Sequence, residues 1–158
     1  MAELQKVVDV YLTGGAAVQI YTESTFRTKD VDLVTIDLNA ATRELEGRGF
    51  TKMGNTWFRE EDRKVVDLLF CPVERPRTVE FVGMSLRTVS LEYLIADRLA
   101  KCKSGLRLGC RQALDILDRY REGLDEDYLR EQLKNFGVDD SFLDEQKLER
   151  LSGIRPRP

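Results

Sequence analysis

The chain has 158 residues, of which 42% are hydrophobic and 34% are charged, so it is long enough to bury the core of one compact domain. Its formal net charge of -3 is spread along the sequence, which excludes a polycationic coat for nucleic acids and leaves only local basic patches for such contacts. The absence of histidine excludes Ser-His-Asp, Cys-His and HExxH catalysis within the chain and favours carboxylates as catalytic groups.

The cysteines Cys71, Cys102 and Cys110 form no CxxC pair, and no apolar signal sequence precedes them. This pattern predicts reduced thiols and no disulfide framework. The apolar runs end after a few residues at a charged side chain, well short of the roughly 20 residues that cross a bilayer. We therefore expect a cytoplasmic protein without a membrane partner.

The first part of the chain alternates short β-prone runs with helical patterns, separated by glycine and proline turns. One helix is expected after the Gly14-Gly15 turn and another over residues 38–48. Strands are expected over residues 10–13, 31–36, 50–53, 56–59 and 64–70, with one or two more in 79–89.

From Ser90 onward the hydrophobic pattern becomes helical. Apolar residues recur at i, i+3, i+4, i+8 and i+11 from Leu91, with Ser90 in the N-cap position. Gly105 ends this helix, and further helices are expected over residues 106–121, 127–135 and 142–151. The fold class that results is α/β (α+β), with an α/β core over residues 1–88 and a C-terminal helical segment over 89–158 that packs on the core.

Three aspartates fall on two of the expected strands. Asp30 and Asp32 are two residues apart, so on a strand they share a face, with Cα atoms roughly 6.6 Å apart at about 3.3 Å per residue. Asp67 stands among the valines and leucines of the 64–70 strand, where a charge needs a metal, a partner or a wet cleft. If the two strands are neighbours, the three carboxylates can bind one or two Mg²⁺ or Mn²⁺ ions.

Gly14 and Gly15 lie between a strand and a helix, where backbone amides form a concave site suited to the phosphates of a triphosphate. Taken alone, a glycine pair is usually a turn, and an Asp-x-Asp motif is usually a solvated strand edge. The order and spacing of the three elements together favour the functional interpretation.

These residues resemble the nucleotidyltransferase superfamily, which includes DNA polymerase beta, poly(A) polymerase and the kanamycin nucleotidyltransferases. The resemblance extends over residues 11–117 and rests on TGGAA at 13–17, RTKDVDLV at 27–34 and VDLL at 66–69. The R-T-x-D-x-D form, together with LEYLIA at 91–96, more narrowly resembles the toxin-like abortive-infection branch and its bacterial relatives.

The resemblance implies a nucleotidyltransferase-type mixed sheet flanked by helices. It also implies metal-dependent transfer of a nucleotidyl group from a nucleoside triphosphate to a hydroxyl acceptor, with release of pyrophosphate. Asp30 and Asp32 would then bind the Mg²⁺ or Mn²⁺ ions, and Asp67 would ligate one of them and activate the attacking hydroxyl. Two metals held by three carboxylates suit in-line attack on the α-phosphate, which needs no histidine.

By the same resemblance, the donor phosphates are assigned to Gly14 and Gly15, to Arg27 of the R-T-x-D-x-D motif and to Arg98 of the first C-terminal helix. Arg98 lies seven residues after Leu91, inside the apolar stripe, so it should face the core unit, where it could reach a phosphate. A structural ion pair is the alternative role for Arg98.

The second C-terminal helix departs from the toxin-like pattern, which has a Lys-Asp pair and a further Asp. The corresponding places are Arg111-Gln112 and Asp115, so only Gln112 loses the expected charge. Asp115 is expected to be partly buried, with Arg111 one turn earlier as its partner. The missing carboxylate weakens the case for toxin-like activity and leaves the metal site intact.

The acceptor stays open at this point: an RNA 3′ end, a protein hydroxyl or a small molecule. The toxin-like branch also implies an antitoxin-like partner protein. A catalytically idle relative that binds nucleotide or a partner protein is the second interpretation, although the presence of all three aspartates favours an active enzyme. A P-loop protein is disfavoured, because the chain has no GK[ST] motif.

Overall fold

The computed structural model describes residues 1–153, and the chain falls into two compact units, Met1–Ser90 and Leu91–Pro158. The first unit is built around a β-sheet, and the described part of the second contains only helices. This division follows the hydrophobic pattern, because short runs with a period of two become strands and the stripe that starts at Leu91 becomes a helix.

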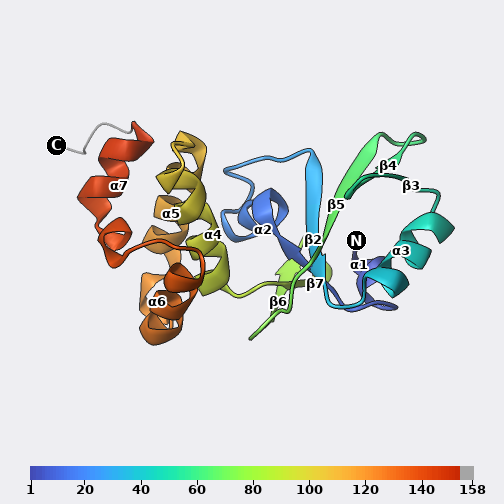
Figure 1. Ribbon diagram of the computed structural model, residues 1–158, viewed down its shortest axis with the longest axis horizontal. Helices are drawn as coiled ribbons and strands as arrows, with labels where there is room; N and C mark the ends of the chain where they lie inside the picture. The colour runs from blue at the N-terminus through green and yellow to red at the C-terminus, as the bar shows by residue number, and fades with distance from the viewer. Residues whose placement is uncertain (154–158) are drawn as a thin grey trace. The chain divides into compact units, whose positions relative to one another are not determined.

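The sheet unit contains a seven-stranded mixed sheet in the order β3-β4-β5-β2-β1-β7-β6 (Figure 1). β2 is parallel to β5 and β1 is parallel to β7, whereas the other neighbouring strands are antiparallel. The strands are β1 (Val10–Thr13), β2 (Asp30–Thr35), β3 (Thr51–Met53), β4 (Thr56–Arg59), β5 (Lys64–Phe70), β6 (Arg77–Phe81) and β7 (Met84–Thr88). The expected fold class, a mixed sheet flanked by helices, is confirmed.

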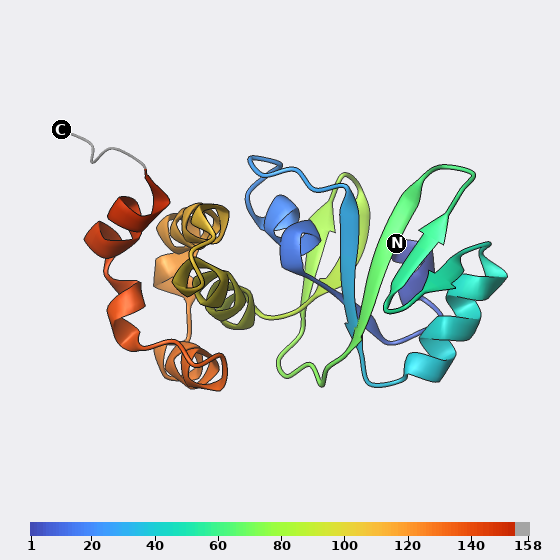
Figure 2. The same ribbon diagram turned by 45° about the horizontal axis from the view of Figure 1, so that its top comes forward.

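Helices cover both faces of this sheet. α2 (Gly14–Tyr21) lies on one face, and α1 (Ala2–Gln5) and α3 (Leu38–Gly47) lie on the other (Figures 1 and 2). α1 was not expected from the sequence, because four residues are too short to show a helical period. The helix α2 begins at Gly14 directly after β1 instead of following a separate turn, and the positive φ of Gly14 makes the change of direction.

Large side chains are buried on the face of the sheet that carries α3. Leu33 of β2 and Val66 of β5 are buried there, and Trp57 of β4, the register partner of Val66, is only 1% exposed. Leu45 of α3 is buried as well. Burial of each such large side chain contributes about 1.5–3 kcal/mol, so this layer fixes the positions of β2 and β5.

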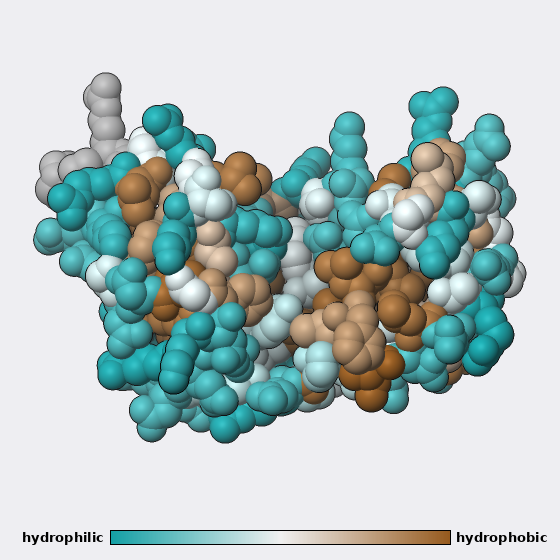
Figure 3. Space-filling view, in the orientation of Figure 1, coloured by the Kyte–Doolittle hydropathy of each residue, from teal (hydrophilic) through white to brown (hydrophobic). Residues whose placement is uncertain are grey.

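The ends of β2 and β5 differ in chemistry. Both strands run in the same direction, with Asp30 at the start of β2 and Phe70 at the end of β5 opposite Thr35. Ile36, Leu69 and Phe70 are 63%, 46% and 62% exposed, and Figure 3 shows brown, apolar side chains gathered over the sheet unit. The strand pair therefore has a charged end, where Asp30 and Lys64 lie, and an apolar end.

Two helices of the helical unit, α6 (Glu126–Asn135) and α7 (Glu145–Ser152), begin with aspartate N-caps. Asp125 accepts a hydrogen bond from the Tyr128 amide at 3.0 Å, and Asp144 accepts one from the Lys147 amide at 3.2 Å, as N-cap residues do. The helices are α4 (Leu91–Lys103), α5 (Arg107–Tyr120), α6 and α7, with two 3₁₀ turns, η1 (Arg121–Gly123) and η2 (Asp140–Leu143).

The expectation of reduced cysteines is wrong for two of the three. Cys102 of α4 and Cys110 of α5 form a disulfide, and Cys71 remains a free thiol. The turn between the two helices folds them back on each other and brings the Cα atoms of the two cysteines to 4.6 Å. Gly109 permits this approach, because a Cβ there would lie 2.7 Å from the Arg98 carbonyl oxygen.

None of the helices within residues 1–153 is both long enough and apolar enough to cross a membrane.

Candidate functional site

Asp30, Asp32 and Asp67 lie on one face of the sheet. Asp32 and Asp67 are register partners in the parallel β2–β5 pair, so their side chains leave the sheet side by side. Asp30 precedes Asp32 by two residues and shares its face. Asp30 is exposed, whereas Asp32 and Asp67 are half-buried. The strands that carry the aspartates are therefore neighbours, as the sequence analysis required.

The Asp32 carboxylate is bound to the start of α2. Its Oδ2 accepts a hydrogen bond from the Gly15 amide at 2.9 Å. A carboxylate is favourable at this place, because the first amides of a helix lack partners and carry the positive end of the helix dipole. Gly14 makes the approach sterically possible: its φ is +58°, and a Cβ on it would lie 2.0 Å from Asp32 Oδ2.

The Asp67 carboxylate is held by the hydroxyl of Thr56. Thr56 is the register partner of Asp67 across the antiparallel β4–β5 pair, and its Oγ1 donates a hydrogen bond to Asp67 Oδ1 at 2.5 Å. Both side chains are half-buried. Thr56 is thus the partner that a charge between Val66 and Leu68 requires.

The segment that leads into β2 is fixed against α2. The Thr28 amide donates to Gln19 Oε1 at 3.3 Å, and Thr28 Oγ1 donates to the Asp30 carbonyl oxygen at 3.2 Å. The same hydroxyl lies 3.1 Å from the place where a Cβ on Gly15 would be, so Gly15 leaves room for it. Arg27, one residue earlier, is exposed and makes no hydrogen bond or ion pair within residues 1–153.

The backbone suits a carboxylate metal site, but the side chains do not form one in their present positions. Across the described residues, no group of three or more Asp, Glu, Cys or His side chains is placed to hold a metal ion. One oxygen of Asp32 accepts from the Gly15 amide, and one oxygen of Asp67 accepts from the Thr56 hydroxyl. Binding of a metal by all three aspartates therefore requires a change in side-chain positions, while the strands can stay in place.

Arg98 lies in the helical unit and is 4% exposed. Its Nε donates to Asp97 Oδ2 at 2.9 Å, its Nη2 forms an ion pair with the same carboxylate, and its Nη1 donates to Gln112 Oε1 at 3.3 Å. Gln112, the position that lacks the carboxylate of the toxin-like pattern, therefore acts as a neutral acceptor for Arg98. These contacts are those of the structural ion pair that was the alternative role for Arg98.

The expected pairing of Asp115 with Arg111 is wrong. Asp115 Oδ2 accepts from Arg119 Nε at 3.0 Å, one turn later on α5, whereas Arg111 Nε donates to the Ser152 carbonyl oxygen at 3.0 Å. Both arginines are one helical turn from Asp115, so sequence spacing could not choose between them. Arg111 instead donates to the carbonyl group of the last residue of α7, where a basic side chain is favourable.

Thr56 and Thr28 are the contacts of the aspartate site that sequence reasoning missed. The sequence contained a signal for Thr56, namely the length of the turn between β4 and β5. Four residues in this turn place Arg59 opposite Lys64. The same register places Thr56 opposite Asp67. Thr28 stood inside the R-T-x-D-x-D motif without an assigned role. Its hydroxyl joins the motif to α2 and the start of β2.

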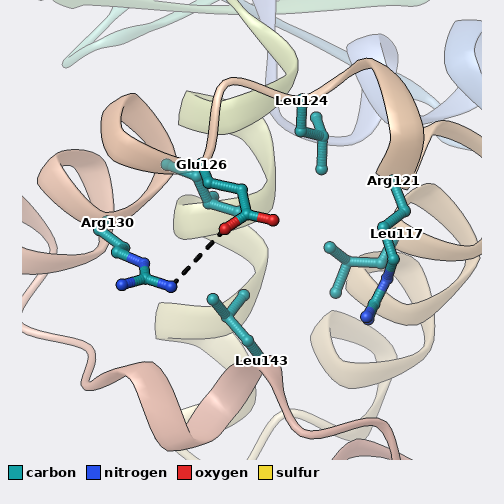
Figure 4. Close-up of a pocket in the computed structure, with 7 residues that line it drawn as sticks. Leu117, Arg121, Leu124, Glu126, Arg130 and Leu143 are labelled. Atoms are coloured by element: carbon teal, nitrogen blue, oxygen red, sulfur yellow. Dashed lines mark ion pairs between the residues drawn. The ribbon is translucent and has the colours of Figure 1, made fainter.

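The helical unit has a small pocket of about 210 Å³ that contains no expected site residue (Figure 4). Leucine side chains line most of it, and Glu126 and Arg130 stand at its edge with an Oε2–Nη2 distance of 3.7 Å. The lining leucines are Leu117, Leu124, Leu129 and Leu143. The charged side chains of the lining are Arg121, Glu126 and Arg130, and no nucleophile stands among them.

Comparison with known proteins gives a fold and no family. No protein-family model matches the chain, and no curated protein matches it significantly. Among solved structures it is similar to an antigenic nucleotidyltransferase-like protein from Paracoccidioides brasiliensis, with a TM-score of 0.57 and 16% identity over 97% of this chain and 89% of that one. The chain therefore has a nucleotidyltransferase-like fold.

Two structures of ANT(2")-Ia are more distant. The crystal structure with adenylyl-2"-tobramycin has a TM-score of 0.46 and 14% identity over 96% of this chain and 89% of that one. The solution structure of this antibiotic-resistance factor has a TM-score of 0.45 and 14% identity over 96% and 84%.

Proposed function

We propose that this protein is a metal-dependent nucleotidyltransferase, which transfers a nucleotidyl group from a nucleoside triphosphate to a hydroxyl acceptor and releases pyrophosphate. The observation that carries the proposal is the register of Asp32 with Asp67, on the sheet face where Asp30 also lies and where Gly14 begins α2. The nucleotidyltransferase-like fold supports the same reaction class.

Asp30, Asp32 and Asp67 are the ligands for the metal, because Mg²⁺ and Mn²⁺ prefer carboxylate oxygens. When bound, the metal neutralises the charge that develops on the transferring phosphoryl group and helps to orient the phosphates. The paired strands supply the rigid part of the site, since Asp32 and Asp67 are already neighbours in register. The side chains then need only rotamer changes to converge.

Binding of a phosphate oxygen to the Gly15 amide would break the hydrogen bond between Gly15 and Asp32, so a single exchange of acceptors frees both groups. In the structure they bind each other at 2.9 Å. When a triphosphate binds, a phosphate oxygen takes the place of Asp32 Oδ2 on the Gly15 amide, and Asp32 becomes available as a ligand. Arg27, which is exposed in the segment beside α2, adds a cation for the donor phosphates.

Asp67 serves as the base for the acceptor. The acceptor oxygen forms a bond to the α-phosphorus while the bond from that phosphorus to the bridging oxygen breaks. Pyrophosphate leaves with the electron pair, and the hydroxyl proton passes to the Asp67 carboxylate. Thr56 orients this carboxylate through its hydrogen bond, so it acts as a positioning residue.

The acceptor belongs to one of three classes: an RNA 3′ end, a protein hydroxyl or a small molecule. We keep a cytoplasmic location and an antitoxin-like partner protein as proposals for the cellular setting. A phosphate-binding role for Arg98 would require it to leave Asp97 and Gln112, so we place this residue second to Arg27 among the phosphate ligands.

A catalytically idle module that binds nucleotide or a partner protein is the second candidate function. The observation that favours it is the pair of internal hydrogen bonds that engage Gly15 and Asp67. An idle protein could keep these bonds permanently, because they satisfy two half-buried carboxylates without metal.

Transfer of radiolabel separates the two candidates. The purified protein is incubated with each nucleoside triphosphate labelled at the α-phosphate, with Mg²⁺ or Mn²⁺, and with RNA, protein and small-molecule acceptor mixtures. We expect label on an acceptor and stoichiometric pyrophosphate with the wild type, and neither with Asp67→Asn. Asp118→Asn is the matched control, because Asp118 is exposed on α5 and remote in sequence from the motifs.

The proposal fails if no triphosphate gives pyrophosphate with any acceptor mixture. It fails as well if Asp67→Asn and Asp118→Asn turn over equally.

A further inference from the structure

A second cavity lies on the face of the sheet opposite the aspartates. Its volume is about 340 Å³, within the range of small-molecule sites, and it opens between α1, α3 and the β2–β5 pair. Val31 and Val66 line it, and they are register partners one residue before Asp32 and Asp67. Successive residues of a strand point to opposite faces, so this cavity is separate from the proposed active site.

The floor of the cavity is apolar and its rim is mostly cationic. Leu4, Leu45 and Phe50 complete the floor. The charged residues that line it are Arg48, Arg59, Lys64 and Glu3. Glu3 is itself bound to Lys6, at 2.5 Å between Oε1 and Nζ. The cavity thus joins an apolar surface to an excess of positive charge.

Arg48 has a hydrogen-bonding group without a partner. Its Nη2 donates to the Glu3 carbonyl oxygen at 3.3 Å and lies 3.7 Å from Glu44 Oε2. Its Nε is buried and has no hydrogen-bond partner within the described residues. An unsatisfied buried donor costs free energy, so a shift of the Arg48 side chain that brings Nε to a ligand's acceptor would be favourable.

Arg59 and Lys64 share one counter-ion. Arg59 binds Asp62 through Nε at 2.9 Å and Nη2 at 2.7 Å, and Lys64 Nζ lies 2.7 Å from the same carboxylate. The hydrogen bonds from Arg59 and then Lys64 hold the pKa of Asp62 well below its usual value. Glu61 also acts on Arg59 through its charge, so the excess of positive charge is that of Arg48, Arg59 and Lys64 over Glu3 in the lining itself.

The α-ammonium group of Met1 is affected by the positive charges of the rim. Its pKa is lowered first by burial and then by the charges of Lys64 and Arg48. Burial is the larger cause, and the charges of Lys64 and Arg48 add to it in the direction of a positive potential. The same potential favours an anion.

We propose that this cavity binds a small oxyanion with an apolar body, with the carboxylate or phosphate group on Arg48 and the apolar part on Leu45, Phe50 and Val66. Arg48 suits this headgroup, because a guanidinium presents several donors in a plane and Nε is unused. Phe50 is already covered by the Arg59 guanidinium at 4.7 Å from its ring centroid, so the apolar body meets an ordered surface.

The test is an NMR titration of the ¹⁵N-labelled protein with four probes in the presence of a chelator. Hexanoate and hexyl phosphate carry an oxyanion and an apolar body, hexanol lacks the charge, and inorganic phosphate lacks the body. We expect saturable shifts from at least one of the first two at the amides of residues 45–50 and 64–66, with affinity at least about tenfold above that of hexanol and inorganic phosphate. The one that binds better identifies the headgroup.

The Arg48→Gln variant should weaken this binding by about tenfold or more, with partial recovery in Arg48→Lys. Arg43→Gln is the matched control, because Arg43 is exposed on the same helix α3. Lys64→Gln, at a side chain that is 61% exposed, serves as a second variant if Arg48→Gln unfolds.

The proposal is overturned if neither oxyanion binds more tightly than hexanol. It is also overturned if the rim variants bind as tightly as Arg43→Gln. No metal, triphosphate or turnover enters the measurement, so its outcome is independent of the proposed nucleotidyl transfer.

Discussion

Gly14 starts α2 at a φ of +58°, directly against the Asp32 carboxylate. We expect Gly14→Ala to lower the free energy of unfolding by about 2–4 kcal/mol, because a left-handed conformation costs alanine about 1–2 kcal/mol and the new Cβ must displace Asp32. The measurement is urea unfolding, with Gly15→Ala as the control. That control should change stability by less than about 1 kcal/mol, since alanine favours the helix and the Cβ meets only Thr28. Equal losses in the two variants would contradict the close approach at Gly14.

The hydroxyl of Thr56 positions the Asp67 carboxylate. Thr56→Val keeps the shape of the side chain and removes the hydroxyl that binds Asp67, so we expect a loss of about 1–2 kcal/mol in the free energy of unfolding. Turnover of the proposed reaction should fall by roughly tenfold or more with little change in the KM for triphosphate, because the acceptor base loses its orientation.

The matched variant is Thr56→Ser, which keeps the hydroxyl and should retain most of both properties. If serine and valine behave alike in unfolding and in turnover, the hydrogen bond has no positioning role.

At the scale of elements, the sequence predicted β1 and β5 with correct ends, because each is a β-prone run bounded by glycine, proline or charged residues. The metal site was conditional on the strands of the aspartates being neighbours, and the parallel register of β2 and β5 meets this condition. It could not predict the side-chain positions, because the rotamers of Asp32 and Asp67 depend on Gly15 and Thr56, which come from other elements.

Two further elements escaped prediction for different reasons. α1 is only four residues long and is held by tertiary contacts: Gln5 binds the backbone of Val10 and Arg87. The Cys102–Cys110 disulfide joins two helices at a sequence separation of 8, which no metal or redox motif of cysteine spacing describes. The helix α1 and the disulfide both depend on tertiary contacts, which the hydrophobic periodicity of the sequence does not show.

The disulfide between α4 and α5 gives the prediction at this scale. Closing a loop of this separation, 8 residues, should stabilise the helices by about 2.5 kcal/mol through the entropy of the unfolded chain. A dithiol reductant should therefore lower the urea midpoint of the helical signal in the wild type and have no such effect in a Cys102→Ser, Cys110→Ser double variant. Cys71→Ser should respond to reductant as the wild type does, because Cys71 is a free thiol.

Alkylation under denaturing conditions, followed by mass spectrometry, counts the free thiols. One modified cysteine is expected before reduction and three after it. Three modified cysteines before reduction would show that the bond is not present in solution.

At the scale of the whole molecule, the sheet unit has two chemically different faces. One carries Asp30, Asp32 and Asp67, and the other opens into the cationic cavity around Arg48. The net charge of -3 is a sum over the whole chain, so it does not show that the two faces carry opposite charge. Overall composition could therefore exclude a polycation but could not locate an anion site. The packing of the C-terminal helical segment on the core, expected from the sequence, stays a prediction.

The central claim is that the aspartates form a site for metal and triphosphate. Its most direct test is a thermal melt of the wild type, Asp32→Asn and Asp118→Asn, each with chelator and with Mn²⁺ plus a nucleoside triphosphate. Asn at position 32 keeps an oxygen that can accept from the Gly15 amide, so the fold should persist while the metal ligand is lost. At ligand concentrations about 100 times the dissociation constant, the wild type and Asp118→Asn should gain about 2.7 kcal/mol of stability, and Asp32→Asn should gain far less. A wild type that does not shift, or an Asp32→Asn protein that shifts as much, would contradict the account.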